Sequence, residues 1–378
     1  MNIDTLLVRS GMLHDSKTGA ISMPIYQSAT FAHPEIGMST GFDYSRTSNP
    51  TRKALEDTMA LLEKGDKGFA FSSGMAALTA VFMLFPAGSH ILVSDDIYGG
   101  TYRLFEVIYK TLGLQFSYID TSNIETIEKN FKPGITKAIF VETPTNPMMK
   151  ITDLRLISTF AQEKGIISIA DNTFMTPCFQ RPIELGINIV AHSGTKYLSG
   201  HNDTLSGFVI TDSPQLSEKI GMIQNTTGGV LAPFDSWLML RSLKTLSIRM
   251  KKIEENAHTI ASYLDSHTAV TQVFYPGFKN HPGYTIHTSQ SSGNGGIISF
   301  YTDNYQRAFD VIRKVSIITF AESLGGVESL ITYPKTQTHA AIPEKIQLRS
   351  GITDCLVRLS VGIEDIHDLI NDLNQALS

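Results

Sequence analysis

The segment INIVAHSGTKY, residues 187–197, is the most informative part of the chain for its fold. It begins with an apolar run, Ile187–Ala191, that has the length and composition of a buried strand, and then becomes polar. Lys196 therefore follows the carboxyl end of a predicted strand, the edge at which open α/β sheets bind ligands. Its amine can form a Schiff base with a carbonyl group, and the hydroxyls of Ser193 and Thr195 can donate to phosphate oxygens.

Short apolar runs alternate with helical stretches on both sides of this segment, from about Gly68 onward. This alternation predicts an α/β fold with a largely parallel sheet that helices cover on both faces. The predicted strands are His90–Ser94, Leu114–Ile119, Lys137–Val141, Gly165–Ala170, Ile187–His192 and Gly207–Thr211, and the predicted helices are Met75–Phe85, Tyr102–Leu112, Ile124–Phe131 and Leu154–Glu163.

The chain of 378 residues is longer than one compact domain, and we expect three parts. Residues 1–60 are predicted to form an irregular arm, because prolines and a Gly37–Gly41 loop interrupt any regular pattern before Leu55–Leu62. Residues 61–245 form a large α/β domain and residues 246–378 a smaller C-terminal α/β domain. In the second half we expect a long, mostly uninterrupted helical stretch at Ser236–Leu264 that serves as a connector, a surface loop at Lys279–Gly295, strands at Gly295–Tyr301 and Cys355–Val361, and a helix at Asp365–Leu377.

The composition argues against several classes of protein. The chain has 31 basic and 36 acidic side chains, a net charge of −5 and no basic block, so nucleic acid is not an expected partner. Its two cysteines, Cys178 and Cys355, stand far apart, so neither a metal site nor a disulfide framework is expected, which fits a reducing cytoplasm. Because we find no secretion signal and no apolar run of the ~20 residues that span a bilayer, we expect a soluble cytoplasmic protein without membrane contact.

Asp171 ends a second apolar run, Gly165–Ala170, and is expected at the same edge of the sheet as Lys196. A carboxylate there can keep a pyridine nitrogen protonated, which makes the ring an effective electron sink. Taken singly, Lys196 also fits a surface position in a polar loop, and Asp171 fits a helix cap. Because both follow predicted buried strands, a shared site is favoured.

Two other loops follow predicted strands. The segment Ser72–Ala77 is a turn of small residues that opens a helix, and such a turn presents N–H groups to a phosphate, although ordinary α/β loops look similar. Tyr98 precedes Gly99 and Gly100, which allow close backbone approach, so its ring can lie flat on a cofactor ring or serve as a packing residue. Neither a Walker-type loop nor a G-x-G-x-x-G opening is present, which disfavours nucleotide and dinucleotide enzymes.

Arg358 stands in the otherwise apolar predicted strand Cys355–Val361, on the face opposite to Val357 and Leu359. A buried guanidinium needs an anionic partner. A bidentate pair with a substrate carboxylate meets this need, and a structural ion pair within the protein meets it equally well.

These segments together resemble the Cys/Met-metabolism family of enzymes that depend on pyridoxal 5′-phosphate (PLP). The resemblance implies the PLP-dependent transferase fold type I, which is like that of aspartate aminotransferase. The segments that carry it extend from the arm to the C-terminal part and are Asp43–Arg52, Ser72–Ala77, Tyr98–Arg103, Glu142–Pro147, Asp171–Phe174, His192–Gly200 and Ala321–Ser329.

The resemblance also implies a role for each matching residue. Lys196 would hold PLP as a Schiff base and then move protons between substrate carbons, Asp171 would pair with the pyridine nitrogen, and Tyr98 would stack on the ring and assist proton transfer. The remaining cofactor contacts would come from Gly74, Met75, Thr173, Ser193 and Thr195, and from Tyr44 and Arg46 of the neighbouring subunit. The substrate would be bound by Arg103, Asn146, Glu322, Ser323, Thr338 and Arg358.

The implied assembly is a homodimer with shared active sites, usually paired into a homotetramer, and the implied activity is trans-sulfuration in methionine and cysteine metabolism. The segments Gly41–Tyr44, His201–Asp203 and Ile331–His339 are most similar to the cystathionine γ-synthase/O-acetylhomoserine thiolyase enzymes of Gram-positive bacteria. This similarity favours γ-replacement on O-acetyl- or O-succinylhomoserine with cysteine. The alternatives are an elimination, as in a cystathionine γ-lyase, cystathionine β-lyase or methionine γ-lyase, and a PLP-binding regulator without turnover.

Overall fold

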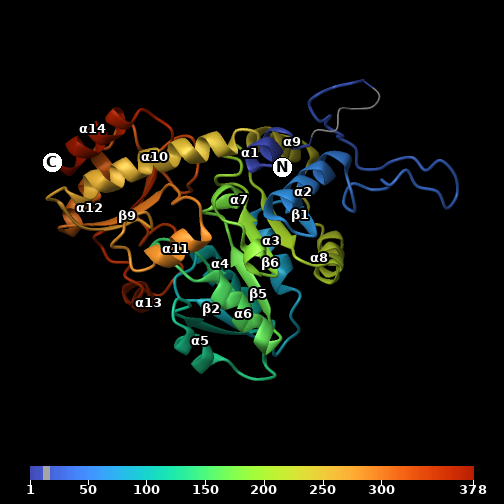
Figure 1. The fold of residues 1–378 in the computed structure, drawn as a ribbon, viewed down its shortest axis with the longest axis horizontal. Coiled ribbons are helices and arrows are strands. Elements are labelled where there is room, and N and C mark those ends of the chain that lie inside the picture. Colours follow the sequence, from blue (N-terminus) through green and yellow to red (C-terminus); the bar gives the residue numbers. More distant parts are fainter. Residues whose placement is uncertain (12–17) are drawn as a thin grey trace.

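The computed structural model describes residues 1–11 and 18–378, and a seven-stranded sheet forms its centre (Figure 1). The strand order is β1-β7-β6-β5-β4-β2-β3. Only β7 runs against its neighbours, so the predicted largely parallel sheet is confirmed. The strands are β1 (Lys67–Phe71), β2 (His90–Ser94), β3 (Gln115–Ile119), β4 (Thr136–Glu142), β5 (Ile167–Asp171), β6 (Ile189–Ser193) and β7 (Gly207–Thr211).

Both faces of this sheet are covered by helices, because the strands are apolar on both sides. In β4, Ile139 and Val141 belong to one hydrophobic cluster, whereas Ala138 and Phe140 belong to another on the opposite face. The covering helices are α2 (Pro50–Glu63), α3 (Gly74–Phe82), α4 (Gly99–Arg103), α5 (Ile124–Asn130), α6 (Leu154–Lys164), α7 (Thr176–Phe179), α8 (Pro214–Thr227) and α9 (Pro233–Leu243).

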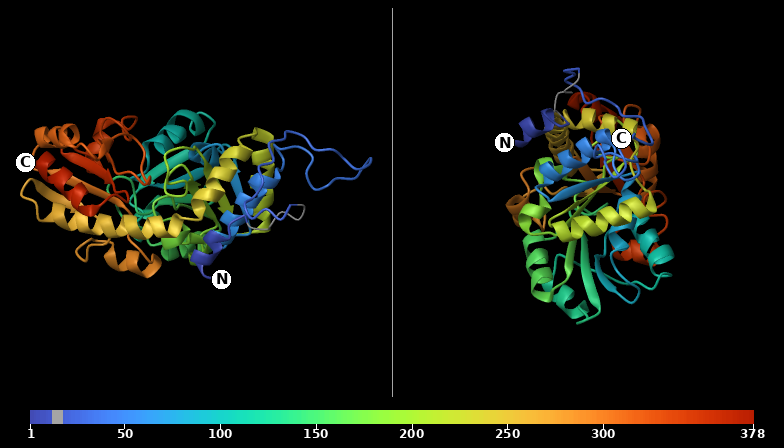
Figure 2. Two further views of the ribbon diagram at one scale, coloured as in Figure 1. Left: turned by 90° about the horizontal axis from the view of Figure 1, so that it is seen from above. Right: turned by 90° about the vertical axis from the view of Figure 1, so that its right-hand side faces the viewer.

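The C-terminal part contains a second, five-stranded sheet in the order β10-β11-β12-β9-β8. The long helix α10 (Leu246–Asp265) and the C-terminal helices pack on this sheet around a hydrophobic cluster of their own (Figures 1 and 2). The strands are β8 (Val270–Phe274), β9 (Ile297–Thr302), β10 (Thr319–Phe320), β11 (Leu330–Thr332) and β12 (Leu356–Ser360), and the further helices are α11 (Tyr284–Gln290), α12 (Tyr305–Lys314), α13 (Glu344–Arg349) and α14 (Ile366–Leu377).

The N-terminal arm is more regular than its sequence predicts. It contains a short helix, α1 (Ile3–Val8), and α2 begins at Pro50 within it, because the Asn49 side chain accepts hydrogen bonds from the first free N–H groups of that helix. Residues 12–17 of the arm lie outside the described residues. Pro24 and Tyr26 are hydrogen-bonded to the start of α2, whereas part of the chain between them and α2 projects away from the rest of the molecule (Figure 2).

The helical stretch predicted at Ser236–Leu264 is confirmed, but it consists of two helices, because the chain breaks between α9 and α10 at Lys244 and Thr245. The predicted start at Ser236 is wrong, since α9 begins at Pro233. The buried side chain of Arg249 donates to the carbonyl of Ser242 at 3.1 Å and to the hydroxyl of Thr245 at 3.1 Å. The Arg249 side chain therefore bonds the carbonyl at the end of α9 and stabilises the break, and no sequence signal predicts these contacts.

The surface loop predicted at Lys279–Gly295 is also wrong, since it contains α11 with two buried polar side chains. His287 lies within 3.0 Å of the carbonyl of Gly293, and Gln290 accepts from the backbone N–H of Leu154 at 3.0 Å. Polar side chains of this segment therefore form hydrogen bonds with buried backbone groups instead of facing solvent.

The helix predicted at Tyr102–Leu112 begins earlier and changes its winding. It starts as α4 at Gly99 and continues as a π-helical segment, Leu104–Tyr109. Among the residues described, we find no helix with the length and apolar character needed to cross a membrane.

Asp372 connects α14 to the turn that follows α12. Its carboxylate accepts from the backbone N–H groups of Ser316, Ile317 and Ile318 at 2.8–3.1 Å. Burial alone would raise the pKa of Asp372, but these hydrogen bonds hold the pKa below its usual value.

We therefore expect D372N to lower the free energy of unfolding by about 1.5–3 kcal/mol at neutral pH, because an NH₂ group then faces N–H donors. Since the folded-state pKa of Asp372 is depressed, its stabilisation is complete above the unfolded-state pKa and is lost as the pH falls through the folded-state pKa. Denaturant unfolding at neutral and acidic pH measures both effects. D368N, which alters an exposed residue one turn earlier, is the control, and equal stability of the two variants at neutral pH would contradict the expectation.

Candidate active site

Lys196 lies just past the carboxyl end of β6, in the wall of a cavity of about 340 Å³. Its Nζ donates to the hydroxyl of Ser323 at 2.8 Å, so the large domain and the C-terminal part meet at this amine. Burial lowers the pKa of Lys196 to about 8, and the charge of Arg358 contributes to the decrease. A lysine with such a pKa supplies a substantial fraction of neutral, nucleophilic amine near neutral pH.

Two carboxylates lie side by side in the same cavity. Asp171 ends β5 and pairs in register with Glu142, which ends β4. Burial raises the pKa of both carboxyls, and the Asp171 charge raises that of Glu142 further. Glu142 was not among the predicted site residues. It directly follows the predicted strand Lys137–Val141, just as Asp171 directly follows the predicted strand Gly165–Ala170, so the same signal would have identified it.

Glu142 also holds two loops that line the cavity. Its carboxylate accepts from the backbone N–H of Tyr98 at 3.1 Å and from that of Asn146 at 3.0 Å. The ring of Tyr98 packs so closely over Gly100 that a Cβ at Gly100 would overlap it. The glycine therefore allows the ring to lie where it does.

The start of α3 forms a concave end of the cavity. Ser73 caps the helix by accepting from the N–H of Ala76 at 3.1 Å, which leaves the N–H groups of Gly74 and Met75 without intrahelical acceptors. A Cβ at Gly74 would lie 2.9 Å from the Cβ of Ser193, so only glycine allows this approach. Thr173 and Thr195 line the same cavity, and together these groups form a suitable site for an anion.

Arg358, on β12, is a buried cation with neutral partners, and its side chain is 1% exposed. It donates to the side-chain oxygen of Asn146 at 2.9 Å, the carbonyl of Ser323 at 2.8 Å and the hydroxyl of Thr332 at 3.2 Å. Its Nε has no hydrogen-bond partner within the described part of the chain. Burial lowers the pKa of Arg358 to about 10, which leaves it charged at neutral pH.

The structure brings most of the predicted site residues to this one cavity but leaves three outside it. Arg103, at the end of α4, is exposed, and its role in substrate binding stays a prediction. Tyr44 is 46% exposed in the arm, and Arg46 donates to the side chain of Asn225 at 3.2 Å in its own chain. The predicted residues that line the cavity are Gly74, Met75, Tyr98, Asn146, Asp171, Thr173, Ser193, Thr195, Lys196, Glu322, Ser323, Thr338 and Arg358.

A buried polar network supports the strand ends from behind, and sequence reasoning did not find it. Glu63 accepts from the side chain of Asn172 at 2.9 Å and lies 2.6 Å from the ring nitrogen Nε2 of His192. Gln180 donates to the side chain of Asn172 at 3.1 Å and to the carbonyl of Thr143 at 3.2 Å. The network ties the residues after β4 and β5 to β6 and α2.

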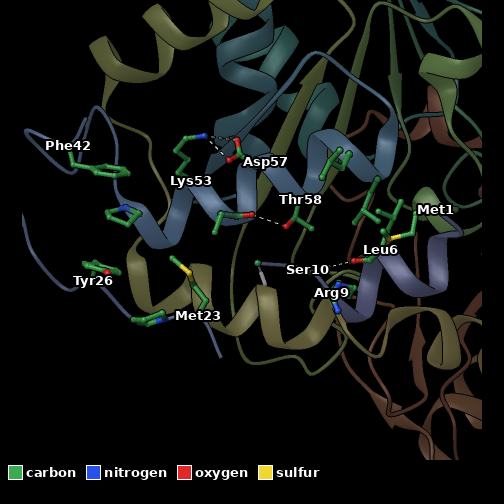
Figure 3. A pocket seen from close by; sticks show the side chains of 16 residues that line it. Met1, Leu6, Arg9, Ser10, Met23, Tyr26, Phe42, Lys53, Asp57 and Thr58 are labelled. Carbon is green, nitrogen blue, oxygen red and sulfur yellow. Dashed lines mark hydrogen bonds and ion pairs between the residues drawn. The ribbon is translucent and has the colours of Figure 1, made fainter. Parts of the chain in front are cut away.

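A larger cavity, of about 570 Å³, lies between α1, the arm and α2 (Figure 3). Its lining includes Leu6, Met23 and Phe42, and most of its lining area is apolar. Lys53 and Asp57 on its wall form an ion pair with each other at 2.6 Å, so their charges are already matched. The concentration of unmatched reactive groups at Lys196 makes the smaller cavity the candidate active site.

Comparison with known proteins agrees with this geometry. Residues 4–378 match the family model described as Cys/Met metabolism PLP-dependent enzyme. Cystathionine gamma-lyase of Bacillus subtilis is 51% identical, and the alignment covers 100% of this chain and 99% of that protein. Cystathionine gamma-synthase of Haemophilus influenzae is 48% identical, with 100% and 98% covered.

A solved structure is equally similar along its whole length. The crystal structure of cystathionine gamma-lyase from Lactobacillus plantarum, complexed with L-serine, superposes with a TM-score of 0.96 at 47% identity, covering 100% of this chain and 98% of that one. The large mixed sheet and the smaller second sheet are therefore those of PLP-dependent fold type I. With a family match over nearly all of its residues, the chain belongs to the Cys/Met metabolism family of PLP-dependent enzymes.

Proposed function

We propose that this PLP-dependent enzyme catalyses γ-replacement on O-acetyl- or O-succinylhomoserine, with cysteine as the thiol, to form cystathionine. Small amino acids of sulfur metabolism suit its family. The observation that carries the proposal is the pairing of Lys196 with Arg358 in one cavity, because Arg358 is a buried cation whose hydrogen-bond acceptors are all neutral. An amino-acid carboxylate would supply the missing anion.

The residues around Lys196 fit PLP. The Lys196 amine, with its pKa lowered to about 8, suits bond formation with an aldehyde. The start of α3, together with Ser193, Thr195 and Thr173, would hold the phosphate, and Tyr98 and Asp171 would contact the ring. When bound, PLP withdraws electrons from the substrate α carbon, which makes loss of its proton feasible.

The chain's own residues would then bind, orient and move protons. Arg358 would bind the substrate carboxylate, with Asn146 and Ser323 holding the guanidinium in place. The Lys196 amine, released in neutral form, would accept the Cα proton. A second proton loss, at Cβ, would let the acyl group leave Cγ as a carboxylate. The cysteine thiol would then lose its proton and bond to Cγ, and protons would return to Cβ and Cα. Tyr98 would assist these proton transfers, and Glu322, at the cavity wall, would face the distal end of the substrate.

We also propose that the active site is shared between two copies of the chain. Tyr44 and Arg46 do not line the cavity of their own chain, and the arm that carries them projects outward (Figure 2). In a homodimer they would reach the phosphate site of the neighbouring subunit. The homotetramer and the cytoplasmic location stay predictions.

Elimination is the second candidate, because the relative named cystathionine gamma-lyase is at least as similar as the one named cystathionine gamma-synthase. The same residues serve both reactions, since the outcome depends on whether a thiol adds at the γ carbon.

The first prediction from this site concerns Lys196. K196A should lose the visible absorbance of the lysine-bound cofactor and all measurable turnover, because Lys196 is the one lysine among the described residues that line the cavity. Absorbance spectroscopy and steady-state kinetics on the PLP-loaded protein measure the two effects. K137A, which removes an exposed lysine on β4, should retain both. A K196A protein with normal absorbance and turnover would refute the assignment.

The second prediction concerns pH. With a pKa of about 8, roughly a tenth of the Lys196 amine is neutral at pH 7, a far larger fraction than in a free lysine. Because the neutral amine is the reactive form, the rate of PLP capture by the cofactor-free protein should rise up to about pH 8 and then level off. Stopped-flow absorbance measures it, with Nα-acetyllysine as the reference amine. A rate that keeps rising with the reference amine above pH 9 would contradict the lowered pKa.

The third prediction separates the two reactions. Acylhomoserine with cysteine should release the acyl group and yield cystathionine faster than cystathionine alone yields ammonia and a keto acid. Chromatographic product analysis under matched conditions decides between them. If the protein consumes cystathionine but releases no acyl group from acylhomoserine in the presence of cysteine, the γ-replacement proposal is wrong and elimination is its reaction.

A further inference from the structure

His339 is a buried histidine that contacts the substrate-carboxylate site indirectly. It lies in the segment between β11 and α13 and is 0% exposed. Its Nε2 lies 2.9 Å from the backbone oxygen of Asn146, and its Nδ1 lies 2.8 Å from the hydroxyl of Thr338. Thr338 and Asn146 line the cavity, whereas His339 does not.

The partners of this ring, which include the backbone of Ile97 besides Asn146 and Thr338, favour one protonation state. Burial lowers the pKa of His339 to about 4, and the charge of Arg358 contributes, so the ring is neutral at neutral pH. A backbone oxygen only accepts, so Nε2 carries the hydrogen and donates to Asn146. Nδ1 is then an acceptor and takes the hydroxyl hydrogen of Thr338. Thr338 consequently presents lone pairs, rather than a donor, to the cavity.

Asn146 is held at three of its polar groups. Its N–H donates to Glu142 at 3.0 Å, its backbone oxygen accepts from His339, and its side-chain oxygen accepts from Arg358 at 2.9 Å. The orientation of this side chain therefore depends on a backbone that is fixed from both sides. If the contact to His339 is lost, the backbone oxygen of a residue that is only 3% exposed has no donor.

The segment that carries His339 is itself fixed in place. Gln347, on α13, donates to the carbonyl of His339 at 2.8 Å and to that of Ile342 at 3.0 Å. On the opposite side the segment packs directly on Gly99, where a Cβ would overlap the backbone oxygen of Thr338. His339 thus lies where the C-terminal part packs closely against the loops that carry Tyr98 and Asn146.

We propose that His339 is a positioning residue for the substrate carboxylate. Its Nε2–H group fixes Asn146, Asn146 orients Arg358, and Arg358 binds the carboxylate. This inference rests on the proposed function, because it concerns how the same cavity holds an amino acid.

The test compares two ligands that differ only in the carboxylate, L-serine and ethanolamine. The affinity of the PLP-loaded protein for each is measured by absorbance titration, which requires no turnover. H339L should bind L-serine about 10-fold more weakly, as expected when an orienting hydrogen bond to a buried group is lost, and ethanolamine about as tightly as the unaltered protein does. In H339Q the side-chain NH₂ can reach the position of Nε2 and should restore most of the affinity, whereas H339N reaches only the position of Nδ1 and should not.

The matched control is H287L. His287 is 1% exposed and lies 3.0 Å from the carbonyl of Gly293, and burial lowers its pKa to about 4, but it does not line the cavity. H287L should therefore leave the ratio of the two affinities unchanged. If H339L weakens both ligands equally, or neither, the positioning role is overturned. If H339L does not fold, the comparison of H339Q with H339N decides, and equal affinities for L-serine in those two variants overturn the proposal.

A double variant tests the route through Asn146. H339L combined with N146A should weaken L-serine no more than N146A alone, because the two residues act in series. Independent, multiplicative losses would overturn the route. The two proposals fail separately, since the proposed function fails if the unaltered protein does not bind PLP at Lys196, whereas the inference fails only if PLP binds and the L-serine affinities contradict it.

Discussion

The active site depends on a guanidinium that is buried without a matching anion. Desolvation of Arg358 is expensive, and its neutral acceptors only partly offset the cost. Those acceptors come from the loop after β4, from residue 323 and from β11, so segments distant in sequence must meet around one charge. Ser323 has a φ of +95°, a strained value for a residue other than glycine, while its carbonyl accepts from Arg358 and its hydroxyl accepts from Lys196. The strain is tolerated where one residue contacts both ends of the cavity.

The parallel strands supply the other half of the site. β4, β5 and β6 are adjacent and end at one edge of the sheet. The backbone alone therefore brings Glu142, Asp171 and Lys196 together, and no contact between their side chains is needed. Burial then sets their ionisation, raising the pKa of the carboxyls and lowering that of the amine. The network behind the edge keeps these strand ends in register.

Sequence periodicity predicted six of the seven strands of the central sheet and the helices α3, α4, α5 and α6, because most of these strands are apolar, but it gave no range for β1, α2, α7 or α8. It also placed Lys196 and Asp171 at one edge, and the same rule extended by one residue would have found Glu142. It did not predict the break before α10, since the end of α9 is bonded by the buried Arg249 side chain of the next helix, and apolar periodicity carries no information about that contact. Nor could it find His339, which is buried through contacts to Asn146 and Thr338 rather than through a pattern along the chain. Tyr44 and Arg46 matched a known motif, but a single chain does not bring them to a cavity.

The close packing of the Thr338 backbone on Gly99 has a consequence for how the chain can vary. No methyl group fits at that point, so the segment that carries Thr338 lies against the start of α4 with no room for one additional carbon atom. A side chain added at Gly99 would have to push apart two segments that both contribute to the cavity wall, through Tyr98 on one side and Thr338 on the other. The shape of the cavity therefore depends on the absence of a side chain at a residue that does not line it.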